Sequence, residues 1–341
     1  MKAYLIRRFL LIFPTIIGIT LLTFMITRVV PGGPVEQAMM VAQFSGAESS
    51  GRNDKGGARE GLSAEDLAYL NELYGFDKPV IVAYFNWLGD ILVLDLGESY
   101  RYNEPVIDLI AERLPISIYY GLMTTIFTYL IAIPLGVLKA IKDKTWVDSG
   151  TSVVIFTGYA VPAFVLGLIL VVYLGGRLEW FPMQGFTSDN FESLNPLEKA
   201  GDILYHSVLP LTCYMIGSFA SMSVLMKNSL LENLSSDYIR TAYAKGLPKK
   251  RVIYVHALRN SLIPLAASFG NNLSLVFTGS YLIEKVFNID GLGLLGFMAV
   301  TERDYPVVLG SLFLTSFIFL IGNILSDICL ASIDPRIRFQ A

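Results

Sequence analysis

Histidine and cysteine, two of the side chains that often perform catalysis, occur only twice each in this chain of 341 residues and are not arranged for a joint reaction. Its two histidines, His206 and His256, stand far apart, and no HExxH pattern or cysteine cluster offers the ligands of a zinc site. No G-x-S-x-G elbow and no Gly-Lys dipeptide occur, which excludes two common motifs for nucleophiles and phosphate binding. Cys213 and Cys329 fall within apolar stretches, where they are expected as small buried hydrophobes. We therefore expect a chain that is not an enzyme, with His256 as a structural residue.

A basic segment from Asp237 to Pro264 carries the most specific pattern of the chain and lies between two apolar stretches. Ser235 or Ser236 can cap a helix that begins at Asp237, because a serine at this position accepts a hydrogen bond from the first turn. Gly246 stands where the residue after a helix adopts a left-handed conformation. The pattern predicts a helix over 237–245.

A second helix is expected directly after the first. Pro248 suits the first turn of a helix over 249–258, so that the whole segment is predicted to be a helix–turn–helix. Ala242 and Gly246 lack bulk and share one face, which could approach another protein closely, flanked by the apolar side chains of Tyr238, Ile239 and Leu247. The alternative is a helix resting on anionic lipid, with the basic side chains of Lys245, Lys249, Lys250 and Arg251 toward the headgroups.

The elements that must position this segment are membrane-spanning helices. Hydrophobic residues make up 53% of the chain and charged residues 16%, and the mean hydropathy is +0.54, which is far from the balance of a soluble domain. The net charge of −3 gives no general attraction to nucleic acid. Six stretches are long enough to cross a bilayer; they are Phe9–Val30, Ile116–Leu138, Thr151–Leu174, Ser207–Met226, Leu262–Ile283 and Pro306–Leu330.

The distribution of basic residues predicts that both termini lie in the cytoplasm. With this orientation, the inner segments hold more than half of the 26 Lys and Arg residues. The first stretch follows Lys2, Arg7 and Arg8 and so resembles a signal peptide. However, its apolar run is too long for a signal peptide, and no small-x-small cleavage site follows it. We therefore reject the signal-peptide interpretation.

The external side is expected to carry a long loop over 31–115. Its middle is rich in Gly, Ser and charged residues and is predicted to be flexible. Ser63 can cap a helix in which Leu67, Leu70 and Leu73 recur at helical spacing. A second amphipathic stretch is predicted over 80–94.

Two places in the spans combine flexibility with polarity. Tyr159 and Pro162 belong to the tract Gly158–Pro162, and Asn271, Ser274 and Thr278 share one helical face of the fifth stretch. Amides and hydroxyls are disfavoured against lipid, so these groups are expected to face protein or water. They could line a translocation path, or they could only hydrogen-bond neighbouring helices.

Several sequence blocks resemble those of one transporter family. The basic segment reads Thr241-Ala242-x-Ala244-Lys245-Gly246 and then His256-Ala257-Leu258-Arg259-Asn260-x-x-Ile263-Pro264. The other blocks are Tyr4-Leu5-x-Arg7-Arg8, Val30–Pro34, Glu284-x-Val286-Phe287, Gly291–Leu295, Arg303–Pro306 and Asp334–Arg336. Together, in this order, they resemble the permeases of ABC importers for peptides and nickel, of the DppB/OppB type. The tracts Tyr74–Pro79 and Phe191–Leu194 are similar to the subgroup that imports oligopeptides and the peptide antibiotic microcin C.

The resemblance implies a fold and a set of partners. The fold is an all-α permease with six transmembrane helices, a single domain over 1–341 in which the external loop is 31–115 and the cytoplasmic ATPase-coupling loop is 227–261. The coupling residues carried over from the family are Tyr238, Ile239, Arg240, Thr241, Ala242, Ala244, Lys245, Gly246 and Leu247. Arg240 replaces the leading Glu of the general ABC loop, and Arg259 replaces its closing Pro, so no salt bridge of that Glu is carried over.

The partners implied by the resemblance are a homologous second permease, two ABC ATPase subunits or one double-length ATPase, and a periplasmic or extracellular peptide-binding protein. The permease pair would import peptides across the bacterial inner membrane by alternating access. ATP and Mg²⁺ would bind the ATPase partners, and no cofactor or metal is expected on this chain.

The remaining alternative is a secondary transporter or channel that works without ATPase subunits. Such a protein usually needs an ionisable group near the middle of the bilayer. Asp327 is the one carboxylate within the six stretches, and it lies near the end of the last, where it is expected to be solvated or paired.

Overall fold

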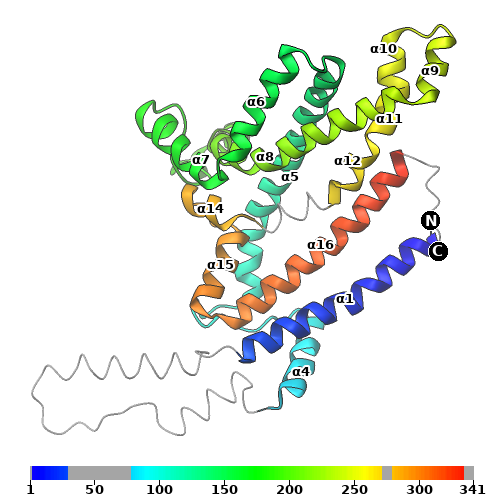
Figure 1. The fold of residues 1–341 in the computed structure, drawn as a ribbon. Helices are drawn as coiled ribbons and strands as arrows, with labels where there is room; N and C mark the ends of the chain where they lie inside the picture. Colours follow the sequence, from blue (N-terminus) through cyan, green and yellow to red (C-terminus); the bar gives the residue numbers. More distant parts are fainter. Residues whose placement is uncertain (1, 30–77, 271–278, 334–341) are drawn as a thin grey trace, which may run out of the picture. The chain divides into compact units, whose positions relative to one another are not determined.

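The computed structural model describes residues 2–29, 78–270 and 279–333, and the regular elements within these ranges are helices (Figure 1). Several predictions fall outside them. These are the flexible middle of the external loop, the helix beginning at Ser63 with its three leucines, the polar residues Asn271, Ser274 and Thr278, and the terminal block Asp334–Arg336.

Within the described ranges, four helices are long and apolar enough to cross a membrane. They are α1 (Lys2–Val29), α5 (Val106–Ile141), α8 (Pro196–Ser235) and α16 (Tyr305–Ile333). Each contains or closely matches one predicted stretch, and α5 and α8 extend well beyond the apolar core that identified them. The first, second, fourth and sixth predicted spans are therefore present as helices.

The third predicted span is not the continuous helix expected over Thr151–Leu174. Instead α6 (Trp146–Ala160) ends before Pro162, and the chain continues through α7 (Ala163–Leu170) into the π-helical η2 (Val171–Arg177). The two arms are bent by 96° and make a fifth span only if they are counted as one. Proline causes the break, because its ring disfavours a helical conformation of the residue before it, and Val161 accordingly has extended backbone angles.

The fifth predicted span is described only at its beginning and end, and it is not helical as far as Ile283 without interruption: Gly279 has φ +77° and Ser280 is extended, so α14 starts anew at Tyr281. α12 (Ile263–Ala267) starts it, and the described chain continues to Gly270 and resumes at Gly279. A helix over 271–278 therefore remains a prediction, while the predicted end at Ile283 is wrong because glycine permits the left-handed turn that ends the span.

Shorter helices complete the described chain. α4 (Val80–Leu92) confirms the amphipathic stretch predicted there, since it buries Ala83, Tyr84 and Ile91 and exposes its opposite face. The others are η3 (Phe191–Ser193), α9 (Asp237–Ala244), α10 (Lys249–Arg251), η4 (Val252–Ala257), α11 (Leu258–Ser261), α14 (Tyr281–Phe287) and α15 (Leu292–Glu302).

Contacts within the chain divide it into two compact units. The described residues of the first unit belong to α1 up to Ile12, to Arg113–Leu295 and to α16 from Phe317 onward. Those of the second belong to Phe13–Glu112 and Gly296–Ser316. Each unit has its own apolar core.

The first unit contains two buried clusters that bear on the expected site. One joins α5, α8, α9, η4 and α12 through side chains that include Met226 and Leu230. The other joins α5, α8 and α14 and includes Cys213, whose side chain is buried as predicted. Cys329 is only partly buried, and both cysteines are free thiols.

Candidate functional site

The predicted coupling helix is present as α9. Its N-cap is Ser236, whose hydroxyl donates back to the carbonyl of Glu232 at 3.3 Å and makes no capping bond to the first turn. Gly246 has φ +78°, the left-handed conformation predicted for it. The N–H groups of Gly246 and Leu247 donate to the carbonyls of Tyr243 and Ala242 at 2.9 and 3.3 Å and so close the helix end.

One face of α9 is turned into this chain's own core. Ile239 is 1% exposed and Ala242 is 7% exposed, and both lie in the cluster with Met226, Leu230 and Val252. The expectation that Ala242 and the knob of Ile239 face a partner protein is therefore wrong. The two residues are three positions apart and so share a helical face. That face is buried because it packs against the larger apolar side chains of α8.

The rest of the α9 surface, opposite and beside the buried face, is exposed and is left for a partner. Its exposed members are Tyr238, Arg240, Thr241, Tyr243, Ala244, Lys245 and Gly246. Leu247 is half-buried against the core. Tyr243 was missed from the sequence; it lies four residues after Ile239, beside the buried face on a helical wheel, so its position alone does not predict that it is exposed. The Arg240 guanidinium lies 3.3 Å from the Asp237 carboxylate, an exposed pair within the same helix.

The second arm of the loop differs in detail from the helix predicted over Lys249–Leu258. α10, η4 and α11 follow one another without a break, and the middle part is π-helical. Val252 and Ala257 are fully buried in the shared core, and the Ser261 hydroxyl donates to the Ser229 carbonyl of α8 at 3.3 Å. Figure 1 shows α9 and α10 side by side beyond the end of α8. His256 is half-buried, and the described part of the chain contains no group of three His, Cys, Asp or Glu residues suited to a metal.

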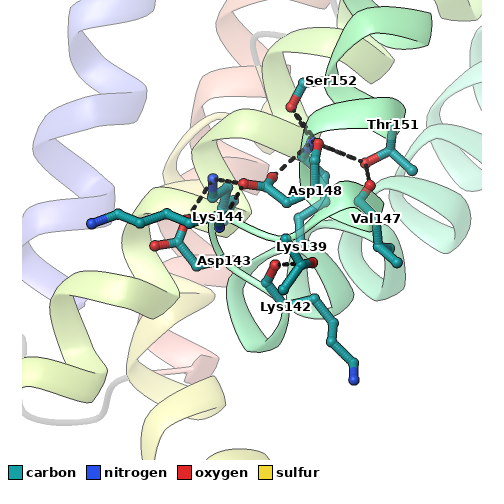
Figure 2. Close-up of polar contacts among 10 residues, drawn as sticks. Lys139, Lys142, Asp143, Lys144, Val147, Asp148, Thr151 and Ser152 are labelled. Atoms are coloured by element: carbon teal, nitrogen blue, oxygen red, sulfur yellow. Dashed lines mark hydrogen bonds and ion pairs between the residues drawn. The ribbon is translucent and has the colours of Figure 1, made fainter.

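A polar network lies at the base of this loop, where the turn between α5 and α6 meets α8 (Figure 2). The side chain of Lys139 is only 1% exposed. Its Nζ donates to the Asp148 carbonyl at 3.0 Å, to Thr151 Oγ1 at 3.1 Å and to Ser152 Oγ at 2.5 Å, and it lies 3.2 Å from Asp148 Oδ1. The buried ammonium is thus satisfied by three hydrogen bonds and a carboxylate.

Lys227 of α8 completes the network. Its Nζ lies 2.7 Å from Asp148 Oδ2 and 2.9 Å from Asp143 Oδ1, so it bridges two carboxylates of the turn. The side chains of Lys142 and Lys144 extend away from the cluster in Figure 2. From the sequence, Lys139 and Lys227 served only to orient the chain in the membrane, because no local pattern links residues so far apart.

The predicted pathway residues are described only in part, and their role in a path remains a prediction. Tyr159 is 55% exposed on α6, and Pro162 is also exposed, at the bend. Asn271, Ser274 and Thr278 lie outside the described residues, so their role as a path remains a prediction.

The block Glu284-x-Val286-Phe287 with Gly291–Leu295 forms a closed cradle rather than a reactive site. The Glu284 carboxylate is buried and accepts hydrogen bonds from the Ser280 N–H at 3.0 Å, the Tyr214 hydroxyl at 3.1 Å and the Leu294 N–H at 2.6 Å. A Cβ atom at any of the surrounding glycines would collide with this carboxylate; they are Gly279, Gly291 and Gly293. The carboxylate ties the start of α14 to the start of α15.

Two more carboxylates have structural partners. Asp304 of the Arg303–Pro306 block is buried and accepts a 2.5 Å hydrogen bond from the Ser99 hydroxyl and a 3.2 Å bond from the Tyr100 N–H. Asp327 pairs with Arg8 at 3.2 Å, as expected for a paired group near the end of the last span.

Comparison with known proteins identifies the family to which this architecture belongs. Residues 132–339, which include α9, the polar network and the Glu284 cradle, match the family described as the inner membrane component of binding-protein-dependent transport systems. The chain belongs to this family. The permease is therefore a multi-pass helical subunit of an ABC transport system, and such a system implies ATPase and substrate-binding partners.

Full-length relatives agree with this assignment. The permease is 40% identical to the peptidoglycan transport system permease protein YejB of Agrobacterium fabrum, over 100% of this chain and 99% of that protein. It is also 40% identical to the inner membrane ABC transporter permease protein YejB of Escherichia coli, with 100% of both chains covered. The oligopeptide transport system permease protein AppB of Bacillus subtilis is 35% identical, over 99% of this chain and 100% of that protein.

Proposed function

We propose that this permease forms, with a second homologous permease, the translocation path of an ATP-driven importer of oligopeptides. In this assembly two ABC ATPase subunits, or one double-length ATPase, bind the exposed face of α9. A periplasmic or extracellular binding protein delivers the peptide on the other side. Both termini lie in the cytoplasm, as the basic residues predict. ATP and Mg²⁺ bind the partners, and this chain carries no cofactor.

The observation that carries the proposal is the two-sided character of α9. One face is fixed in the permease core by Ile239 and Ala242, while the other presents Thr241, Ala244 and Lys245 to solvent. A docking helix must be packed firmly against its own protein, because a movement of the ATPase would otherwise deform the loop instead of moving the transmembrane helices. If α9 instead rested on anionic lipid, its basic side chains would suffice, and packing of the opposite face into the core would not be required.

The proposed mechanism is alternating access. ATP closes the ATPase dimer, the docked loops of the two permeases move inward, and the long helices rock to open the path toward the binding protein. Hydrolysis of ATP resets them. Within this cycle the permease contributes rigid transmission and a path, and its partners contribute the free energy.

The substrate class rests on the relatives' names. One is named for oligopeptides and another for peptidoglycan, so a second candidate is the peptide-bearing fragment of peptidoglycan. Competition uptake separates the two: unlabelled peptides should displace a labelled oligopeptide from the reconstituted importer more strongly than muropeptides do. The reverse order would favour the second candidate. Uptake of microcin C-like peptides can be measured in the same assay.

Gly246→Trp tests the docking surface. No heavy atom lies within 4 Å of the position that a Cβ atom would occupy at Gly246, so the bulk projects into solvent, where the ATPase is proposed to sit. We expect peptide-stimulated ATP hydrolysis and transport to fall by about tenfold or more, since a bulky group in a buried contact removes about 1–3 kcal/mol. Both are measured in proteoliposomes with the full complex.

The matched controls separate docking from backbone strain. Gly246→Asn keeps a residue that tolerates the left-handed conformation and should retain most activity. Gly201→Trp places the same bulk at an open glycine near the other end of α8 and should be close to native. Native transport by Gly246→Trp would contradict the assignment of this surface.

The alternative function is transport by this chain without ATPase subunits. Purified permease alone in liposomes should move no labelled peptide down its gradient or with a proton gradient. Substrate movement in the absence of ATPase subunits would show a secondary transporter or channel instead.

A further inference from the structure

The polar network beside the loop joins α5, α6 and α8, the helices that must move when the loop moves. α9 reaches the core through Ile239 and Ala242, and this core contains Met226 and Leu230 of α8 and Val137 of α5. α5 and α8 approach closely at Gly136, where an added Cβ would come within 2.5 Å of the Met226 Cβ. A displacement of α9 is therefore passed directly to α5 and α8 by close packing.

The beginning of α6 is not held by packing of this kind. An open groove of about 460 Å³ lies along it; the groove is lined by Leu135 of α5, Phe219 of α8 and, from α6, Trp146, Val147, Gly150, Thr151, Val154 and Ile155. Close contact between α6 and α8 returns farther along, at Gly158, where an added Cβ would come within 2.9 Å of Ile216. Near the loop, α6 contributes no residue to the apolar cluster that joins α5, α8 and α9, so polar contacts carry more of its attachment there.

Lys227 bridges this gap. From α8 it reaches Asp148 in the first turn of α6 at 2.7 Å and Asp143 in the preceding turn at 2.9 Å. Lys139 holds the same Asp148 from α5 and binds Ser152 one helical turn later (Figure 2). The bridge is partly shielded, since the side chain of Lys227 is 18% exposed and that of Asp148 is 9% exposed, and such charge-assisted contacts are short and directional.

We propose that Lys227 is a positioning residue for energy coupling, which makes the first turns of α6 follow α8 when the ATPase moves the α9 loop. The proposal rests on the function proposed above. The Lys227 ammonium converts movement of α8 into movement of α6 across the groove, and α6 leads into the bend at Pro162. Without the bridge, α6 stays tied to α5 through Lys139 but loses its direct polar link to α8, so the span formed by α6 and α7 follows the loop less closely.

Lys227→Gln is the decisive variant, because it removes the link to α8 and leaves the Lys139–Asp148 pair intact. Lys227→Arg restores a cation that can bridge two carboxylates. Lys199→Gln is the matched control: Lys199 also belongs to α8 and pairs with Glu192, at 3.3 Å, but in an exposed position. All variants are assayed in the complete complex with its ATPase and binding protein.

We expect Lys227→Gln to keep ATP hydrolysis by the ATPase partners but to lose much of its coupling to peptide import. Lys227→Gln should assemble normally and hydrolyse ATP when stimulated by the loaded binding protein, while the peptide imported per ATP falls about fivefold or more, the range of typical coupling energies. Lys227→Arg should recover most of this ratio, and Lys199→Gln should keep it. A native ratio in Lys227→Gln, or an equal fall in hydrolysis and import, would overturn the proposal, because the residue would then be dispensable or merely structural.

A second readout separates this proposal from the proposed substrate. Hydrogen exchange of residues 146–152 is compared between the resting and the ATP-trapped complex, which needs no peptide. The native complex should change its protection there together with α9, and Lys227→Gln should change it only at α9. If the native complex imports no peptide, the function proposed above fails while this measurement still decides the role of Lys227; unaltered coupling of the two segments in Lys227→Gln would refute it.

Discussion

At the scale of single residues, the charged groups near the loop divide into a buried set and an exposed set. Lys139 and Asp148 have side chains 1% and 9% exposed, whereas Asp143 is 29% exposed. Removing one partner of a buried pair leaves the other charge without compensation, and this cost exceeds the value of the pair itself. The consequences of neutralising the two aspartates should therefore differ.

Asp148→Asn should destabilise the permease strongly, because the buried Lys139 ammonium keeps its hydroxyl partners but loses its carboxylate. The expected loss is about 3–5 kcal/mol in the free energy of unfolding. Asp143→Asn should cost less than about 1 kcal/mol, as for a pair near the surface. Unfolding of both variants in detergent, followed by circular dichroism, measures the difference, and equal midpoints would contradict the distinction.

At the scale of elements, glycine and proline decide how helices meet. Pro162 bends the chain between α6 and α7, and the glycines around Glu284 let α14 and α15 share one carboxylate. Gly293 and Gly296 of α15 provide a matched pair. A Cβ atom at Gly293 would lie within 2.8 Å of both Glu284 Oε1 and the Ser280 nitrogen, whereas at Gly296 it would meet nothing within 4 Å.

Gly293→Ala should cost about 1–3 kcal/mol of stability, because backbone atoms of the cradle must shift. Gly296→Ala should be neutral, or stabilising by up to about 1 kcal/mol, since alanine favours a helix. Thermal unfolding of the purified permease distinguishes them. An undisturbed Gly293→Ala protein would show that the cradle tolerates bulk.

The polar face predicted for the fifth span is tested by thiol labelling. Asn271→Cys, Ser274→Cys and Thr278→Cys are each made in a chain in which the two native cysteines are replaced. If these residues line a translocation path, a water-soluble thiol reagent should label them in the resting or the ATP-trapped complex. Absence of labelling in both states would leave only hydrogen bonding between helices, and Phe317→Cys, on an apolar exposed position of α16, serves as the lipid-facing control.

At the scale of the whole molecule, the length of the external segment 31–115 exceeds what a connection between two spans requires, which suggests a surface for the binding protein. Deleting residues 47–59 should change transport little. Placing glutamate at Leu67, Leu70 and Leu73 together should weaken stimulation of ATP hydrolysis by the loaded binding protein, because it destroys the apolar face of the predicted helix. Cross-linking from this segment provides the check: if no cross-link reaches the binding protein, the contact is wrong.

The sequence by itself determined the features of this permease that depend on neighbouring residues. Apolar runs long enough for a bilayer predicted the spans, and the serine, glycine and proline positions around 236–248 predicted α9 and its left-handed end, because helix formation, capping and chain reversal are local. The order of short blocks was enough to indicate the family.

Only the tertiary structure decided which side of each element faces inward. Both faces of α9 offered apolar residues, and packing on α8 chose the one with Ile239 and Ala242. The Lys139–Asp148–Lys227 network and the Glu284 cradle join residues that lie far apart in the sequence, so no local pattern could predict them. The sequence showed a proline at position 162 but not its effect. A proline can either kink a membrane helix or break it, and the neighbouring helices determine which of the two occurs.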